Sequence, residues 1–437
     1  MSKVKRFLGA LYRKLSKLWV PTLAALLHKC GFKYRFVFFQ CYGIGHLAVE
    51  PDLFLKEELL GIRPPFPAIW LAPRDLLANR HLFAYWARRF RVVQSPWIAR
   101  LLLPFVQTEQ LGFETYAYAL DRHKASRYPQ IQLQWQHRPP LLALNEEDRD
   151  HGWSVLKTLG VPEGAWFVCV HCRESGFRPN ETFHAFRDAD IMTYVPAMEA
   201  VTARGGWCIR MGDKTMKPLP KLPNVIDYAL DPAKSEPMDV FLCAACTCFL
   251  GSNSGLCNIA DIFGVPVAMA NQVPLAHVLP YGYVDLAIPK LYWSAADQRF
   301  LTFKEIFDSP SCGYDESRHF ARAEITLVDN SPEEIRELLL ELLETANATV
   351  AYTKEDNERQ RRFKSLMRPE HMTYGAGSRV GRHFLRQHER LYAATPRNEA
   401  ATDGTDFTER SAGGRCELGQ LAPWAAMRAH GGQRAWP

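Results

Sequence analysis

The sequence predicts an α/β fold with parallel sheets, on three observations. The chain has 437 residues, of which 47% are hydrophobic and 23% charged, the composition of a globular protein with sizeable cores. Short β-branched and aromatic runs alternate with helical stretches, as in βαβ units. This alternation occurs in two successive series, so we expect two Rossmann-like domains, at 36–150 and 151–345.

The first series contains three predicted strands, each a short run rich in β-branched or aromatic residues. A glycine turn after the first run leads into a helix. The strands are expected at 36–42 (FVFFQCY), 69–73 (IWLAP) and 91–95 (RVVQS), and the helices within 43–61 and around 75–89.

The second series repeats the pattern with five strands. Its first helix ends at Gly160, and Pro196 must either kink the next helix or occupy its first turn. The strands are expected at 166–173, 207–212, 224–229, 247–252 and 265–271, and the helices at 148–160, 189–206, 238–246, 254–264 and 333–345. We expect 346–392 to supply closing helices and 393–437, rich in Ala, Gly, Arg, Thr and Asp, to be a disordered tail.

The first 35 residues form a basic arm, because they hold nine Lys and Arg and the first acidic residue is Glu50. The rest of the chain has a slight excess of acids, which disfavours a nucleic-acid groove across the body. Within 3–19, cations surround an apolar helical face, which suits the anionic inner leaflet of a membrane. That face consists of Val4, Phe7, Leu8, Leu11, Leu15, Leu18 and Trp19.

The alternative for this arm is a helix packed on the protein's own body. We find no stretch long and apolar enough for a spanning helix, and the apolar run at 18–27 is interrupted by Pro21. The expected location is therefore cytoplasmic, with peripheral attachment to the inner membrane face.

The cysteines favour a reducing compartment. There are 11, an odd number, and several lie in apolar runs such as FVCVHCR and FLCAACTCFL. We interpret them as buried thiols. A metal or redox site at 243–248 is the alternative, but the run offers too few ligands, so we expect no metal.

The loops after the predicted strands are the candidate sites, because ligands of parallel α/β sheets lie at the carboxyl ends of the strands. The segment 252–255 (Ser252, Asn253, Ser254 and Gly255) joins a strand to a helix. Small residues and free N–H groups at a helix start suit a diphosphate, although a plain helix cap has the same pattern. The segment matches neither GxGxxG nor a Walker loop.

Charged or hydroxyl residues end three further strands. Arg173 has the fork geometry that clamps phosphate, and His171 and Glu174 beside it could move protons, although a salt-bridged arginine and a core histidine are the alternative. The other strand ends present Arg210, Asp213, Asp227 and Tyr228.

A further candidate site lies in the first series. Gly43 and Gly45 would let a substrate approach the backbone before a helix, with His46 facing a cleft between the domains. Glu50 follows one helical turn later and could orient the imidazole. The alternative is a tight turn with a surface histidine.

These residues lie in blocks that resemble a family of bacterial glycosyltransferases from surface-polysaccharide gene contexts, related distantly to O-fucosyltransferase-like GT-B enzymes. The resemblance runs from Trp166 to Phe307, and the first-domain glycine loop shares it. The matching blocks include FVCVHCRESGF, MDVFLCAACTCFLGSNSGL, FGVPVAMAN and GIGHLAVEPDLFL.

The resemblance implies a GT-B fold: two facing Rossmann-like domains with a nucleotide sugar in the cleft between them. The donor would bind the second domain, with Arg173 and 252–255 on its diphosphate, and the acceptor would be a glycan or a lipid-linked sugar. The sequence HCRE differs from the HxRRxD of many fucosyltransferases, which leaves the donor base and sugar open. GT-B enzymes usually need no bound metal, and the chain has no DxD motif, so no cofactor is expected.

Catalysis would then stabilise the departing diphosphate and activate an acceptor hydroxyl. Arg173 and the helix start would do the first, with Arg210 as a helper. His46, Glu174 and Asp190 are the candidate bases, and the likeness leans toward inversion. The alternatives are a non-catalytic sugar-nucleotide or glycan-binding scaffold, a sugar-nucleotide epimerase on the same fold, and a zinc or redox protein.

Overall fold

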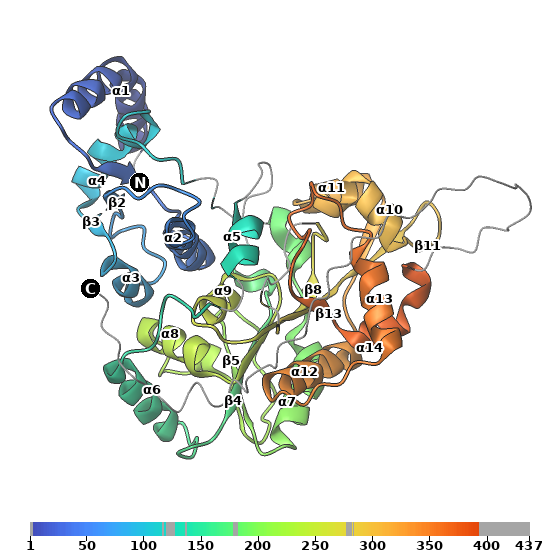
Figure 1. The fold of residues 1–437 in the computed structure, drawn as a ribbon. Coiled ribbons are helices and arrows are strands. Elements are labelled where there is room, and N and C mark those ends of the chain that lie inside the picture. Colours follow the sequence, from blue (N-terminus) through green and yellow to red (C-terminus); the bar gives the residue numbers. More distant parts are fainter. Residues whose placement is uncertain are drawn as a thin grey trace, which may run out of the picture.

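The computed structural model describes residues 3–115, 118, 127–135, 138–177, 182–276, 282 and 284–392. It confirms an α/β fold with parallel sheets (Figure 1). The predicted tail at 393–437 lies outside the described residues.

The larger sheet has seven strands, all parallel, in the order β13-β9-β8-β7-β4-β5-β6. Six of them, taken in chain order from β4, follow the 3-2-1-4-5-6 arrangement of a Rossmann domain. The strands are β4 (Phe167–His171), β5 (Trp207–Arg210), β6 (Val225–Ile226), β7 (Cys248–Gly251), β8 (Val267–Gln272), β9 (Leu286–Pro289) and β13 (Arg379–Val380).

Helices cover both faces of this sheet. One face is packed by α7 (Val195–Thr202) and α12 (Pro332–Ala346), and the other by α6 (Glu146–Thr158), α8 (Glu236–Ala245) and α9 (Gly255–Ile262) (Figure 1). Pro196 occupies the first turn of α7, one of the two predicted outcomes. The thiols of Cys169, Cys243 and Cys248 lie in the core, as buried hydrophobes.

The stretch after β9 differs from the prediction. A second, antiparallel sheet appears there, in the order β11-β10-β12. Residues 346–392 supply helices, as expected, but also β13, which extends the parallel sheet beside β9. The additional elements are β10 (Leu291–Ser294), β11 (Arg299–Phe300), α10 (Phe303–Asp308), α11 (Ser317–Arg322), β12 (Ile325–Val328), α13 (Lys354–Lys364) and α14 (Arg382–Gln387).

The first series forms a smaller parallel sheet in the order β1-β2-β3. Its strands are shorter than predicted. The elements are β1 (Arg35–Val37), α2 (Ile44–Leu59), β2 (Ala68–Leu71), α3 (Arg80–Ala87), β3 (Arg91–Val93), α4 (Pro96–Leu102) and α5 (Tyr128–Trp135).

The basic arm is one continuous helix, α1 (Lys3–Lys29), which runs through Pro21. Its second half packs on the small sheet, because Val20 and Ala24 join Phe36 and Phe105 in a local core. Side chains of the predicted apolar face remain exposed nearer the N-terminus, with Leu18 at 79% and Leu15 at 49%. Packing on the body and an unpartnered apolar face therefore coexist in this helix. None of the helices within the described ranges is both long and apolar enough to cross a bilayer.

The main hydrophobic core is continuous between the two sheets. It runs from Val37 and Trp70 beside the small sheet to Val168 and Leu250 in the large one. Helix α2 packs directly against α9. The structure therefore joins the two predicted domains through shared packing, and the expected cleft is closed where these two helices meet.

Candidate active site

The two loops singled out in the second series meet at the centre of the large sheet. Strand order reverses between β4 and β7, and the loops that follow these neighbouring strands are 172–174 and 252–254. The Ser252 N–H donates to the His171 carbonyl at 3.1 Å, and the Ser252 hydroxyl accepts from the Arg173 N–H at 2.9 Å. The crevice beside such a reversal is where α/β proteins of this topology bind ligands.

Several polar atoms in this crevice are buried without a hydrogen-bond partner. They are His171 Nδ1, Asn253 Oδ1 and Ser254 Oγ, all within the described part of the chain. The Asn253 amide is fixed, since its Nδ2 donates to the Val273 carbonyl at 2.6 Å. A buried polar atom left unpaired costs free energy, which a bound ligand would recover.

His171 is a neutral imidazole here. Burial, aided by the positive charge of Arg210, lowers its pKa to about 3. It can therefore exchange a hydrogen bond with a ligand but cannot supply positive charge near neutral pH.

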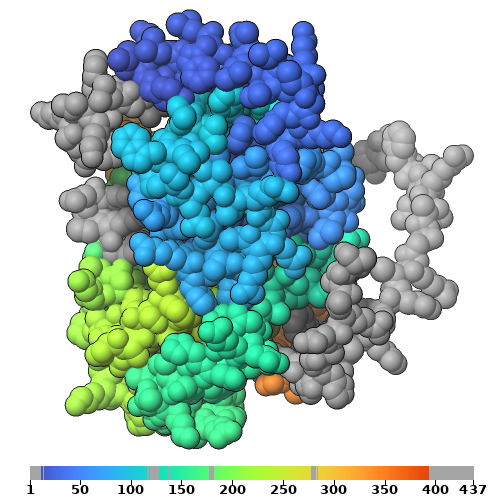
Figure 2. Space-filling view, turned by 90° about the vertical axis from the view of Figure 1, so that its left-hand side faces the viewer, coloured from blue at the N-terminus to red at the C-terminus, as the bar shows by residue number. Residues whose placement is uncertain are grey.

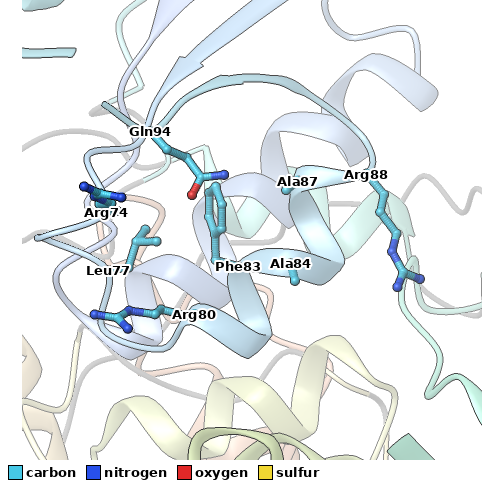
Figure 3. Close-up of a pocket in the computed structure, with 8 residues that line it drawn as sticks. All are labelled: Arg74, Leu77, Arg80, Phe83, Ala84, Ala87, Arg88 and Gln94. Carbon is cyan, nitrogen blue, oxygen red and sulfur yellow. The ribbon is translucent and has the colours of Figure 1, made fainter. Parts of the chain in front are cut away.

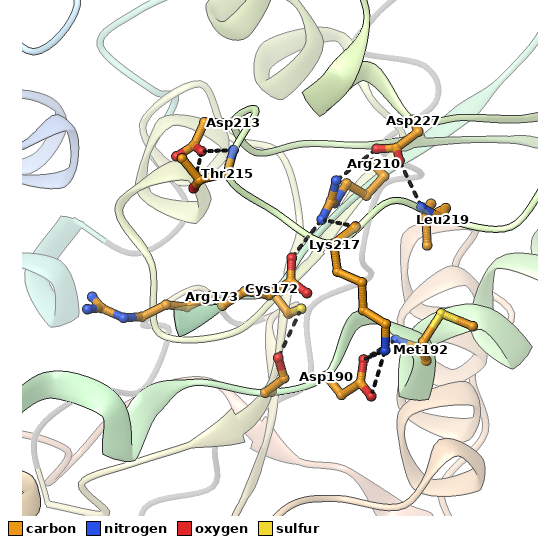
Figure 4. Close-up of polar contacts among 12 residues, drawn as sticks. Cys172, Arg173, Asp190, Met192, Arg210, Asp213, Thr215, Lys217, Leu219 and Asp227 are labelled. Carbon is orange, nitrogen blue, oxygen red and sulfur yellow. Dashed lines mark hydrogen bonds and ion pairs between the residues drawn. The ribbon is translucent and has the colours of Figure 1, made fainter. Parts of the chain in front are cut away.

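The guanidinium of Arg173 is the cation of this loop. Its Nε donates to Asp188 Oδ1 at 3.0 Å, and the side chain is 12% exposed. A guanidinium has five donors, and the Nη groups, for which no described residue is a partner, can donate to a ligand. Figure 4 shows the side chain extending away from Arg210. Burial raises the pKa of Asp188, although Arg173 opposes this shift.

Asp188 is a site residue that the sequence did not reveal. It reaches Arg173 from an irregular segment 15 residues downstream. Its carbonyl accepts from Lys290 Nζ at 2.7 Å, and this lysine also pairs with Asp329. Nothing in the local pattern distinguishes this aspartate from its neighbours, so no sequence signal could have found it.

The expectation that Arg210, Glu174 and Asp227 face the ligand is corrected by their contacts. Arg210 is fully buried, and its guanidinium donates to Asp227 Oδ1 at 2.8 Å, Glu174 Oε2 at 2.7 Å and the Lys217 carbonyl at 3.1 Å (Figure 4). The two carboxylates neutralise this charge inside the protein. The three residues therefore hold the ends of β4, β5 and β6 together.

Three other predicted residues are also engaged locally. The Tyr228 hydroxyl is buried and bonds the backbone of Ser235. Asp213 accepts from the N–H of Thr215 and so closes its own turn, and the exposed Asp190 pairs with Lys217 at 3.1 Å. These contacts stabilise the loops around the crevice.

The glycine loop of the first series lies against the second. His46 Nδ1 is 2.8 Å from Glu50 Oε1, which confirms the predicted contact, and Glu50 also accepts from the Gln40 N–H at 2.7 Å. A buried carboxylate thus fixes an imidazole whose side chain is 30% exposed. A ring held in this way keeps one tautomer and orientation, as a general base requires.

Glycine at positions 45 and 255 allows two helices to touch, whereas we expected it to let a ligand approach the backbone. A Cβ on Gly45 would lie 2.9 Å from Gly255 Cα, and a Cβ on Gly255 would lie 2.6 Å from Gly45 N. The helix starts of α2 and α9 therefore touch, and the space expected for a ligand at these glycines is filled by the opposing backbone. At Gly43 the nearest atom to an added Cβ is His46 Cδ2, at 3.0 Å.

No metal centre is found in the described ranges, since no three His, Cys, Asp or Glu side chains gather there as ligands. The chemistry available at this site is thus a cation, a helix start, unpaired polar atoms and an oriented imidazole nearby.

Comparison with solved structures gives a distant similarity. A solved structure described as the glycosyl transferase family 9 protein from Veillonella parvula DSM 2008 is similar with a TM-score of 0.30 and 12% identity, over 55% of this chain and 80% of that one. No protein-family model and no curated protein matches the chain. A likeness this remote assigns no function, so the function has to be argued from the site.

Proposed function

We propose that the protein is a glycosyltransferase that moves a sugar from a nucleotide-sugar donor to a glycan or lipid-linked acceptor in bacterial surface-polysaccharide assembly. The observation that carries the proposal is the meeting of loops 172–174 and 252–254 at the reversal point of a Rossmann-type sheet. Buried polar atoms there lack partners.

The donor diphosphate would sit between Arg173 and the turn formed by Asn253 and Ser254, beside the point where the starts of α2 and α9 touch. Glycosyl transfer leaves a nucleoside diphosphate, whose developing charge must be stabilised as the glycosidic bond breaks. The Nη groups of Arg173 supply that charge without a metal ion. His171, Asn253 and Ser254 would then satisfy their unpaired atoms on the nucleotide or its sugar.

His46 is the proposed base on the acceptor side. It lies on α2, whose start touches the start of α9, and Glu50 orients its ring. An imidazole bonded to a carboxylate through Nδ1 can accept a hydroxyl proton at Nε2. Transfer by direct attack of that hydroxyl would invert the anomeric centre.

The exposed apolar side of α1, with Lys14 and Lys17 also exposed, is proposed to hold the enzyme on the inner membrane face. Such attachment raises the local concentration of a lipid-linked acceptor. The protein would then act in the cytoplasm.

Donor binding is tested by the melting temperature of the full chain with GDP, UDP, CDP, CMP and dTDP. A ligand at one hundred times its Kd stabilises the folded state by about 2.7 kcal/mol. Arg173→Lys keeps a charge for Asp188 but removes the planar fork, so it should weaken the response to the nucleoside diphosphate that binds. Lys214→Ala, at an exposed position in a neighbouring loop, should leave that response unchanged.

Turnover distinguishes the proposal from its alternatives. A metal-independent transferase is expected to release nucleoside diphosphate from the matching nucleotide sugar. This release should persist in EDTA and be lost in Arg173→Ala. Nucleotide binding without any turnover would indicate a sugar-nucleotide-binding scaffold, and conversion of the donor sugar without an acceptor would indicate an epimerase. Absence of binding by every nucleotide would contradict the proposal.

A further inference from the structure

A pocket of about 630 Å³ lies beside the smaller sheet and is separate from the loops that follow β4 and β7. Its volume is within the usual range for small-ligand sites, roughly 300–1,000 Å³. Phe83 and Leu77 form its apolar part, and Arg74, Arg80, Arg88 and Gln94 supply its polar part (Figure 3).

The topology places this pocket at the carboxyl edge of the small sheet. Arg74 follows β2, Gln94 follows β3, Arg80 begins α3 and Arg88 follows its last residue. The Arg74 N–H donates to the Gln94 carbonyl at 3.0 Å, which joins the two loops. A crevice at the carboxyl ends of parallel strands is the usual ligand position in such sheets.

The pocket carries a net positive charge. Among the described residues, no carboxylate forms an ion pair with the guanidinium of Arg74 or Arg80. Asp75 pairs with Arg100, and the carboxylate of Glu236, which accepts from the backbone N–H of Arg80 at 2.6 Å, offsets only part of the positive charge.

Two of these arginines lie together. In Figure 3, Arg74 and Arg80 lie on one side of Phe83, whereas the Arg88 side chain extends away on the other side. Two like charges at one pocket attract an anion, and the planar fork of arginine matches the oxygens of a phosphoryl group.

An exposed apolar surface adjoins this pocket. Helix α4 begins two residues after Gln94 and exposes Trp97 at 83%, Ile98 at 51% and Leu101 at 54%. Helix α1 lies beside it, since the Tyr12 hydroxyl donates to the Leu101 carbonyl at 2.7 Å. Figure 2 shows the dark blue surface of α1 above the lighter blue surface of residues around 75–105, on one face of the molecule.

This surface has the composition of a membrane-binding face. A tryptophan with leucine and isoleucine suits the interface between headgroups and acyl chains. Exposed Lys14 and Lys17 lie on α1, which complements an anionic leaflet. A membrane seated on α1 and α4 would bring lipid headgroups next to the arginine pocket.

We propose that Arg74 and Arg80 bind the phosphoryl group of a lipid at the membrane surface on which α1 and α4 rest. The inference deepens the proposed function, because such a lipid would carry the acceptor sugar. The binding of a phosphoryl group in this pocket does not itself require the transferase reaction.

The first test is calorimetric titration of the full chain with pyrophosphate. Arg74→Gln/Arg80→Gln should weaken binding at this pocket by roughly tenfold for each arginine. Both side chains are exposed, so the variant should fold, which circular dichroism would verify. Arg91→Gln, at an exposed arginine of β3 outside the pocket, is the matched control and should bind as the wild type does.

Pyrophosphate could also occupy the proposed donor site, and Arg173→Ala separates the two. Binding lost in Arg74→Gln/Arg80→Gln but kept in Arg173→Ala supports the pocket whatever the fate of the transferase proposal. Binding unchanged in Arg74→Gln/Arg80→Gln, or absent in the wild type, overturns the pocket and leaves the donor site to its own nucleotide test.

The source of the phosphoryl group is tested with vesicles. Phosphatidylcholine vesicles containing phosphatidic acid should bind the wild type more tightly than vesicles containing phosphatidylglycerol, and the double variant should lose that preference. Loss of pyrophosphate binding with the vesicle preference unchanged would assign the pocket to a soluble phosphorylated ligand, which overturns the lipid assignment.

Discussion

At the scale of single residues, burial decides what each candidate side chain can do. Arg173 follows β4 and Arg210 ends β5, and these two strands are parallel neighbours. The sequence around each arginine suits a diphosphate equally well. Arg210 has two carboxylate partners and no exposed surface, whereas Arg173 has one partner at Nε. The first is therefore part of the scaffold, and the second keeps donors for a ligand.

Replacing Arg210 by methionine should destabilise the protein by about 3 kcal/mol, because Glu174 and Asp227 would be left as partly buried charges without their partner. The change would be measured as the free energy of unfolding in urea. Arg100→Met removes an exposed pair with Asp75 and should cost about 1 kcal/mol or less. Equal losses in the two variants would contradict the assigned role of Arg210.

His171 should make stability depend on pH. Its pKa of about 3 in the folded protein lies below the ordinary value of 6.5, so the unfolded chain binds more protons between these values. Stability is then fully present above pH 6.5 and declines as the pH falls toward 3. Denaturation of the wild type and His171→Asn across this range should show a smaller acid loss in the variant. Parallel curves would refute this expectation.

At the scale of elements, the contact between α2 and α9 depends on two glycines. An added Cβ on either would come within 3 Å of the opposing backbone. Gly45→Ala and Gly255→Ala should each destabilise the protein by about 1–3 kcal/mol, because backbone cannot move aside as a side-chain tip can.

The double variant tests whether the two glycines serve one contact. Once the first Cβ has separated the helices, the second meets less resistance, so the combined loss should be smaller than the sum of the single losses. Urea denaturation of all four proteins completes the cycle. Full additivity would show that the two positions act independently.

Local pattern predicted most elements of the chain, because helix and strand periodicity depend on residues close in sequence. The nine segments predicted from β4 to α12 lie near their expected places. The ribbon of β10, β11 and β12 was missed, since its strands are short and pair antiparallel within a region of mixed pattern. Strand β13 has only Arg379 and Val380, and it exists because β9 offers a free edge.

At the scale of the whole molecule, the two sheets are joined by one core. Trp70 of the small sheet and Phe249 of the large one belong to the same continuous cluster. Two separate domains would have two cores and a wet boundary. The protein should therefore lose both sheets together.

Thermal unfolding should show a single transition, with the calorimetric enthalpy equal to the van't Hoff enthalpy. Circular dichroism and tryptophan fluorescence should give the same midpoint. Two resolved transitions would show that the sheets unfold as separate units and would support the predicted two-domain division at residue 150.

The sequence by itself determined the alternation of strands and helices, the basic arm and the loops that end the parallel strands, because each depends on short-range periodicity or on composition. It also placed Glu50 one turn from His46, since helix geometry fixes that neighbour. Only the tertiary structure decided that Arg210 is neutralised, that Asp188 holds Arg173, and that Arg74 and Arg80 share a pocket. Those relations join distant segments, and packing sets them.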